Sequence, residues 1–314
     1  MRDTQRALVA TLVAAACWGL SGTMAQALFE RFEFPILGLG AVRMLGAGAI
    51  LLLFVGPRGR PPLTLSFVSF AVLGVAATQL TFLEAVQLSN AVTATLLQYL
   101  FLPMVAGYEA LRGRVAWSAR WTATLVVAGA GTVLLVAGVN ARSLGVVVTP
   151  LGLVFGLGAA VAGAYYSLAG ARLVHEHGPW SVSSWGFLVG GVVTLPFGAA
   201  SFIGYAPPSG VAPWVELVGL LVVIVLIGTV VAYGLYLYGL RYLPATEVGV
   251  VSSLEPIASA VATYAFLGVV LTGVQYAGGA LIVLAVALLG LHPPAPPAHG
   301  PRAPEPSVGN GPYL

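Results

Sequence analysis

The sequence predicts an all-α membrane protein with ten transmembrane helices, arranged as two inverted five-helix repeats. Its composition is the first indication, because the 314 residues are 59% hydrophobic and 7% charged, with a mean hydropathy of +0.96. Soluble domains carry about 25% charged residues. The second indication is a series of membrane-length apolar segments, and the third is a Leu-Pro motif that occurs in both halves of the chain.

Ten apolar segments of about 17 to 25 residues, the length that crosses a bilayer, recur along the chain. Pairs of glycines four residues apart, such as Gly152/Gly156 and Gly186/Gly190, predict close packing between such helices. We expect the helices near residues 7–29, 35–55, 66–87, 91–111, 118–138, 148–172, 181–203, 213–238, 246–267 and 271–291.

The two halves contain related segments that indicate an internal duplication. Leu102-Pro103 in the fourth expected helix corresponds to Leu254-Glu255-Pro256 in the ninth, and each segment follows a short polar turn. Duplication of an odd number of helices inverts the second copy in the membrane. We therefore expect a first repeat at residues 1–139, a second at 148–291 and a disordered Pro-rich tail at 292–314.

The basic residues predict how the chain is oriented. All thirteen are arginine. With a cytoplasmic N-terminus, only Arg31 and Arg142 fall in outside segments, and Arg43 lies within a helix. The other ten face inside, as the positive-inside rule requires, and both termini are then cytoplasmic. The positive net charge thus reports topology and does not indicate a nucleic-acid partner. The inside-facing group is Arg2, Arg6, Arg58, Arg60, Arg112, Arg114, Arg120, Arg172, Arg241 and Arg302.

The sequence argues against catalysis, and we assign no catalytic residue, metal ligand or cofactor. Gly19-Leu20-Ser21-Gly22 matches the Gly-x-Ser-Gly pattern of intramembrane serine proteases, but that chemistry needs a histidine base within the membrane. The four histidines lie in a loop or beyond the last expected helix, and Asp3 is the only aspartate. The single cysteine, Cys17, excludes an internal disulfide.

Ionisable side chains inside a membrane are costly and so are functional candidates. Arg43, Glu84 and Glu255 lie within expected helices, and Arg43 and Glu84 lie at similar depths. An Arg43–Glu84 ion pair is the interpretation we favour, with Arg43 binding a substrate carboxylate as the alternative. Glu255 is able to bind a proton, a substrate ammonium or a neighbouring helix. Pro103 and Pro256 predict paired kinks that act as hinges. Glu109, Glu216 and Glu247 lie near helix ends, where we expect interfacial roles.

Aromatic, amide and hydroxyl side chains away from the helix ends predict a substrate-binding pocket. A cavity lined by such groups, with few charges, suits an amphipathic and roughly neutral solute, whereas a phosphorylated one would need several inward cations. Hydrogen bonding between helices is the alternative role for the amides and serines. The predicted substrate-binding residues are Trp18, Gln79, Phe82, Gln98, Tyr99, Tyr166, Trp185, Tyr233 and Ser252.

With these motifs, the chain resembles the EamA-type branch of the drug/metabolite transporter superfamily over about residues 6–291. The likeness is carried by the segments 17–22 (CWGLSG) and 236–245 (YLYGLRYLPA), by Arg43 and by Leu254-Glu255-Pro256. Glu84 departs from the family pattern, and the glutamate often found between the last two helices is missing. The resemblance implies a secondary transporter of the bacterial inner membrane, most similar to exporters of aromatic and other hydrophobic amino acids.

The expected activity is thus export of a small-molecule substrate across a lipid bilayer by alternating access, from a single chain that works as a monomer. Cationic drugs or nucleosides are alternative substrates, and a channel is the alternative class. Proton coupling through Glu255 or Glu84 and uniport are both compatible with the sequence.

Overall fold

The computed structural model describes residues 2–56, 60–89, 91–112, 119–137 and 149–268, with four short pieces between 272 and 284. Every regular element in this described part is helical, and two of them, η2 and η3, are π-helical. The elements are α1 (Arg2–Phe32), α2 (Ile36–Val55), α3 (Leu65–Ser69), η2 (Phe70–Ala76), α4 (Ala77–Leu88), α5 (Ala91–Gln98), α6 (Phe101–Leu111), α7 (Ala119–Ala137), α8 (Pro150–His177), α9 (Pro179–Ala200), α10 (Val211–Val222), η3 (Val223–Val231), α11 (Ala232–Tyr242), α12 (Ala245–Ser252) and α13 (Glu255–Leu267).

Seven helices in the described part are long and apolar enough to cross a membrane. They correspond to the expected helices 1, 2, 3, 6, 7, 8 and 9. The segment expected at 91–111 instead forms two shorter helices, α5 and α6, while α7 covers most of 118–138. The expected helix at 271–291 falls mostly outside the described residues, and so does the tail at 292–314.

Both Leu-Pro segments interrupt the regular helix where paired kinks were predicted, and the role of these kinks as hinges stays a prediction. Between α5 and α6 the backbone turns at Tyr99 and Leu100, and between α12 and α13 it turns at Ser253 and Leu254. The turns are closed by bonds to the third preceding residue, such as the N–H of Leu100 to the carbonyl of Leu97 at 3.2 Å. Each proline then lies in the first turn of a new helix, where its missing N–H costs little.

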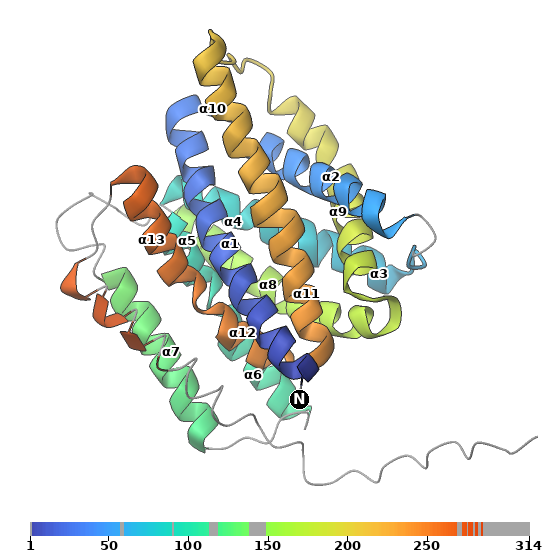
Figure 1. The fold of residues 1–314 in the computed structure, drawn as a ribbon, viewed down its shortest axis with the longest axis vertical. Coiled ribbons are helices and arrows are strands. Elements are labelled where there is room, and N and C mark those ends of the chain that lie inside the picture. The colour runs from blue at the N-terminus through green and yellow to red at the C-terminus, as the bar shows by residue number, and fades with distance from the viewer. Residues whose placement is uncertain are drawn as a thin grey trace, which may run out of the picture.

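The helix contacts of the two halves correspond. α1 packs against α11, η3 and α13, whereas α8 packs against α4, η2 and α5, and α2 packs against α9. Figure 1 shows α1 beside the α10–α11 segment along the middle of the molecule, with α13 next to α1. The broken helices and the π-helical segments therefore surround one central region.

Small residues let these helices approach closely, as the glycine pairs predicted. A Cβ at Gly156 would lie 2.4 Å from Leu97 on α5, and one at Gly190 would lie 2.9 Å from the carbonyl oxygen of Ala71 in η2. A Cβ at Gly19 would lie 2.4 Å from the backbone nitrogen of Ser259 on α13. The packing around the central region thus has no room for side chains at these positions.

Candidate substrate-binding site

Two small adjoining cavities are lined by residues of α1, α2, α4, α5, α6, α8, α11, α12 and α13. Their volumes are ≈ 30 and ≈ 20 Å³, enough for one or two water molecules. Trp18, Gln98, Tyr233 and Glu255 line both cavities and so lie between them. The first is also lined by Thr78, Tyr99, Phe101, Gly163, Tyr166, Ser167, Tyr236 and Ser252, and the second by Ser21, Gly22, Arg43 and Phe82.

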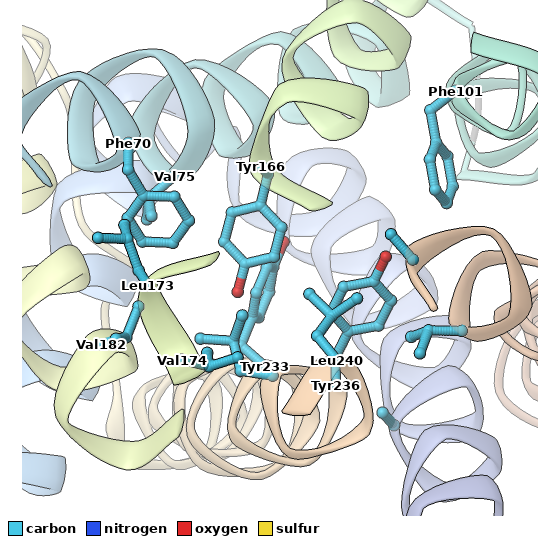
Figure 2. Packing of buried hydrophobic residues seen from close by; sticks show 14 of the residues in the cluster. Phe70, Val75, Phe101, Tyr166, Leu173, Val174, Val182, Tyr233, Tyr236 and Leu240 are labelled. Atoms are coloured by element: carbon cyan, nitrogen blue, oxygen red, sulfur yellow. The ribbon is translucent and has the colours of Figure 1, made fainter. Parts of the chain in front are cut away.

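Aromatic rings form one wall of these cavities. The Trp18 ring on α1 lies 4.8 Å from the ring of Tyr233 and 5.0 Å from that of Tyr236, both on α11. Tyr166 on α8 meets Tyr233 edge to face, with their centroids 5.7 Å apart. Figure 2 shows Tyr166 pointing toward Tyr233, with Tyr236 beside them. The rings come from three helices of both halves, so movement between the halves would change the shape of the cavities.

Several polar atoms in the cavity walls are buried and have no hydrogen-bond partner among the residues that the structure describes. They are Nε1 of Trp18, Oγ of Ser21, Oγ1 of Thr78 and the hydroxyl of Tyr166. Buried polar groups in proteins are almost always paired, and the exceptions need an explanation. A polar molecule bound in the cavities would supply partners for these groups.

Arg43 and Glu255 bring opposite charges to the second cavity. Both are buried, with exposed fractions of 3% and 6%. The Nε of Arg43 donates to Oγ1 of Thr229 at 3.2 Å, and Thr229 in turn donates to the carbonyl of Ile224, five residues earlier in π-helical η3. Among the described residues, no ion pair within 4.0 Å joins Arg43 to Glu255.

Tyr99 connects the two broken helices. Its hydroxyl donates to the carbonyl oxygen of Ser252, and its oxygen lies 3.0 Å from Oε2 of Glu255. In a continuous helix the Ser252 carbonyl would bond to the N–H of residue 256, which is a proline. Tyr99 therefore supplies the donor that Pro256 lacks. A phenol carries one proton, so the two acceptors share it when Glu255 is ionised, whereas a protonated Glu255 is able to donate its own O–H to the Tyr99 oxygen.

The structure brings most of the predicted residues to the cavities but leaves some outside. Two of the predicted substrate-binding residues, Gln79 and Trp185, do not line either cavity. Gln79 is buried elsewhere, and the Trp185 ring lies 5.3 Å below the guanidinium of Arg60. Glu84 and Pro256 also lie outside the linings. The cavity-lining predicted residues are Trp18, Phe82, Gln98, Tyr99, Tyr166, Tyr233, Ser252, Arg43 and Glu255.

Two expectations about charged residues were wrong. The Arg43–Glu84 ion pair does not form among the described residues, because Arg43 turns toward Thr229 while Glu84 stays half-buried on α4. Glu109 and Glu247 are buried, at 4% exposure each, and are not interfacial. The carboxylate of Glu109 accepts a hydrogen bond from the N–H of Ala245, 3.1 Å away, at the start of α12. Glu216 does lie at the surface, paired with Arg31.

The cavities also include residues that the sequence did not single out for binding. Ser21, Thr78 and Ser167 are common residue types in membrane helices, and Thr229 acts indirectly by holding Arg43. Whether these side chains reach a cavity depends on which face of each helix points toward the cavities. The sequence of an apolar helix does not reveal that face. Within the described ranges, no group of three His, Cys, Asp or Glu side chains is placed to hold a metal ion.

The membrane-length helices of the described part define a multi-pass α-helical membrane protein. The sequence model of the EamA-like transporter family matches residues 5–137 and again residues 150–291. The chain therefore belongs to the EamA-like transporter family and is a membrane transporter.

Known proteins of this family resemble the chain over different lengths. It is 31% identical over 299 residues to YicL of Salmonella typhimurium, described as an uncharacterized inner membrane transporter, with 93% of this chain and 97% of that protein covered. It is 34% identical over 133 residues to the threonine/homoserine exporter RhtA of Escherichia coli K12, with 42% of each chain covered. One protein crystal structure matches with a TM-score of 0.69 at 19% identity, covering 91% of this chain and 96% of that one, and so shares the fold.

Proposed function

We propose that this transporter is a secondary exporter of small metabolites, foremost aromatic or other hydrophobic amino acids, across the bacterial inner membrane. The observation that carries the proposal is the pair of central cavities. They combine opposite charges from Arg43 and Glu255, a wall of aromatic rings and buried polar atoms that have no partner within the described ranges. This combination matches a zwitterion with an apolar side chain. Among the described lining residues Arg43 is the only cation, which does not suit a phosphorylated solute.

The relatives support an amino-acid substrate but leave its side chain open. RhtA is a threonine/homoserine exporter, and it matches less than half of this chain. The rings of Trp18, Tyr166, Tyr233 and Tyr236 favour apolar or aromatic side chains over small hydroxylated ones, because their faces bury large apolar area. Both kinds of amino acid therefore belong in the test.

We further propose that transport proceeds by alternating access between two inverted five-helix repeats, residues 1–139 and 148–291, that complete ten helices. The family model matches twice, and the helix pairs around α1 and α8 correspond. Tyr99 and Ser252 each precede a helix-breaking proline by four residues, and they contact each other. Contact between equivalent positions is what a two-fold axis between the repeats would produce. Discontinuous helices at the centre of such repeats form the binding sites of many transporters.

Proton coupling through Glu255 is part of this proposal. Loss of a proton from Glu255 would leave the single Tyr99 proton shared between two acceptors, the Glu255 carboxylate and the Ser252 carbonyl. The proton on Glu255 is thereby linked to the contact between the two broken helices. Glu255→Gln should abolish the component of transport driven by a pH gradient, so that any remaining uptake proceeds at the same rate with and without the gradient. Unchanged gradient dependence in Glu255→Gln would remove this role.

The function is tested by uptake into proteoliposomes of the purified full-length chain, with labelled Trp, Phe, Met, Thr and homoserine. We expect saturable uptake, competition by unlabelled substrate and acceleration by substrate preloaded inside the vesicles. Counterflow of this kind requires a carrier, so uptake without it would favour a channel. Absence of uptake for every amino acid would contradict the substrate assignment, and cationic drugs and nucleosides would then be tested.

A further inference from the structure

We infer that Arg43 and Glu255 bind the two poles of one α-amino acid, with the carboxylate on Arg43 and the ammonium on Glu255. This inference rests on the proposed function, since it specifies how that substrate is recognised. It also assigns the two charged residues separate tasks. Each pole can be removed from the ligand independently, so the two assignments can be tested one at a time.

Arg43 is arranged to accept an anion from the cavity. Its guanidinium makes one hydrogen bond to the described residues, from Nε to Thr229, which leaves the four N–H groups of its two Nη atoms for a ligand. A buried guanidinium with most donors unused is costly unless an anion pairs with it. The planar fork of donors matches both oxygens of a carboxylate. Thr229 fixes the orientation of the fork from η3.

Glu255 is arranged to accept a cation from the same cavity. It is the first residue of α13, and Thr95 on α5 and Tyr99 in the turn after α5 stand beside its carboxyl group. The rings of Trp18 and Tyr233 line the cavities with it, and aromatic faces attract ammonium groups. A substrate ammonium would therefore meet a carboxylate and aromatic faces together.

The two poles of an α-amino acid are joined through one carbon atom, so their binding groups must lie close without neutralising each other. Arg43 and Glu255 meet both conditions, because they line one small cavity and form no ion pair. The side chain of the ligand would then extend from the second cavity toward the first, past Trp18, Gln98 and Tyr233, which lie between the two. Tyr166 and Tyr236 line the first cavity and would contact an apolar side chain.

The test is equilibrium binding to the full-length protein in detergent, by competition with labelled substrate and by calorimetry. The probes are two matched series, each with an amino acid, its amine without the carboxylate and its acid without the amine. One series is phenylalanine, 2-phenylethylamine and 3-phenylpropionate. The other is threonine, 1-amino-2-propanol and 3-hydroxybutyrate. In the wild-type protein the amino acid should bind about 10- to 150-fold more tightly than either partial ligand, as expected for loss of one charge-assisted contact.

The variants should separate the poles. Arg43→Gln should lose the preference for the amino acid over the amine, while its preference over the acid remains. Glu255→Gln should do the reverse. Arg31→Gln and Glu216→Gln, which remove the same charges from an exposed ion pair, are the matched controls and should bind like the wild type. A variant that merely misfolds would weaken all three ligands of a series alike, and calorimetry of unfolding identifies it.

The outcomes distinguish this inference from the proposed function. If amino acids are transported but both variants weaken amine and acid equally, or show the opposite pattern, the pole assignment is overturned and the function stands. If neither amino acid is transported or bound, the proposed function fails. In that case the acids and amines would still test the assignment of each pole. Binding of the acid that is lost in Arg43→Gln, and binding of the amine that is lost in Glu255→Gln, would support it. Absence of both effects would overturn it.

Discussion

Replacing Tyr99 with phenylalanine removes one hydroxyl group from the contact between the broken helices and keeps the ring. Tyr99 is 5% exposed, and its ring packs 5.6 Å from that of Phe101, which the substitution preserves. The lost hydroxyl donates to the Ser252 carbonyl, for which Pro256 provides no N–H. The substitution therefore leaves a carbonyl in the centre of the protein without its donor.

The expected cost follows from two opposing magnitudes. A buried acceptor left without a donor costs about 1–3 kcal/mol in soluble proteins. Side-chain hydrogen bonds between membrane helices average only about 0.6 kcal/mol and reach about 1.7, because the unfolded chain in the membrane also finds partners. For a carbonyl that proline has already deprived of its helical donor, we expect about 1–2 kcal/mol, a factor of about 5 to 30 in the folded-to-unfolded ratio.

Unfolding of the purified protein in detergent, by heat or by increasing SDS, measures this loss. Tyr166→Phe is the matched control, because the Tyr166 hydroxyl is buried, lines the same cavity and has no partner in the described part of the chain. Its removal should leave stability unchanged or slightly raised. Equal stability of Tyr99→Phe and the wild type would refute this account of the contact, and so would an equal loss in Tyr166→Phe.

Pro256→Ala offers a second check on the same reasoning. Alanine restores an N–H four residues after Ser252, in the first turn of α13, and this N–H is a second candidate donor for the Ser252 carbonyl. The cost of Tyr99→Phe should then be smaller in the Pro256→Ala protein than in the wild type. A double-mutant cycle measures the difference, and an unchanged cost would mean that Tyr99 stabilises the protein through another contact.

Two further substitutions test the packing and the support of Arg43. Gly19→Ala would place a Cβ 2.4 Å from a backbone nitrogen of α13, so we expect overpacking to cost about 1–3 kcal/mol in thermal unfolding. Gly107→Ala, which meets no atom within 4 Å, should not destabilise, and an equal loss in both would contradict the packing argument. Thr229→Val removes the acceptor of the Arg43 Nε and should weaken binding of the amino acid about 3- to 10-fold, without changing binding of the matching amine. Thr194→Val is the control, because in the described part of the chain the Thr194 hydroxyl bonds within α9. Equally weakened amino-acid binding in Thr194→Val would exclude a specific role for Thr229.

Much of the central site was predictable because its residues are exceptions in a membrane sequence. Arg43 and Glu255 are ionisable groups within apolar segments, and both reach the cavities. The prolines marked where the helical hydrogen bonding changes, although sequence alone did not distinguish a kink from a break. That distinction depends on the turn at Tyr99–Leu100 and Ser253–Leu254, which tertiary contacts such as the Tyr99 hydrogen bond stabilise.

The partners of these residues were not predictable, because depth along a helix does not define direction around it. Arg43 and Glu84 lie at similar depths, yet Arg43 faces η3 and the cavity. The π-helical turns add to the difficulty, since each shifts the helical register and changes which side chains face inward. Thr229 contacts Arg43 from the π-helix η3. Gln79 lies on α4, just after the π-helix η2, and is outside the cavity linings.

The small volume of the cavities connects the binding site to the broken helices. Ligand pockets usually measure about 300–1,000 Å³, whereas these cavities measure ≈ 30 and ≈ 20 Å³, so an amino acid enters only if the walls move apart. Among the lining residues, Tyr99 joins the α5–α6 break to the α12–α13 break through Ser252 and Glu255. A substrate ammonium that takes over the Glu255 carboxylate would remove one of these two contacts. Under the proposed function, substrate binding and separation of the two halves would therefore be coupled through the same carboxyl group, as alternating access requires of a central site.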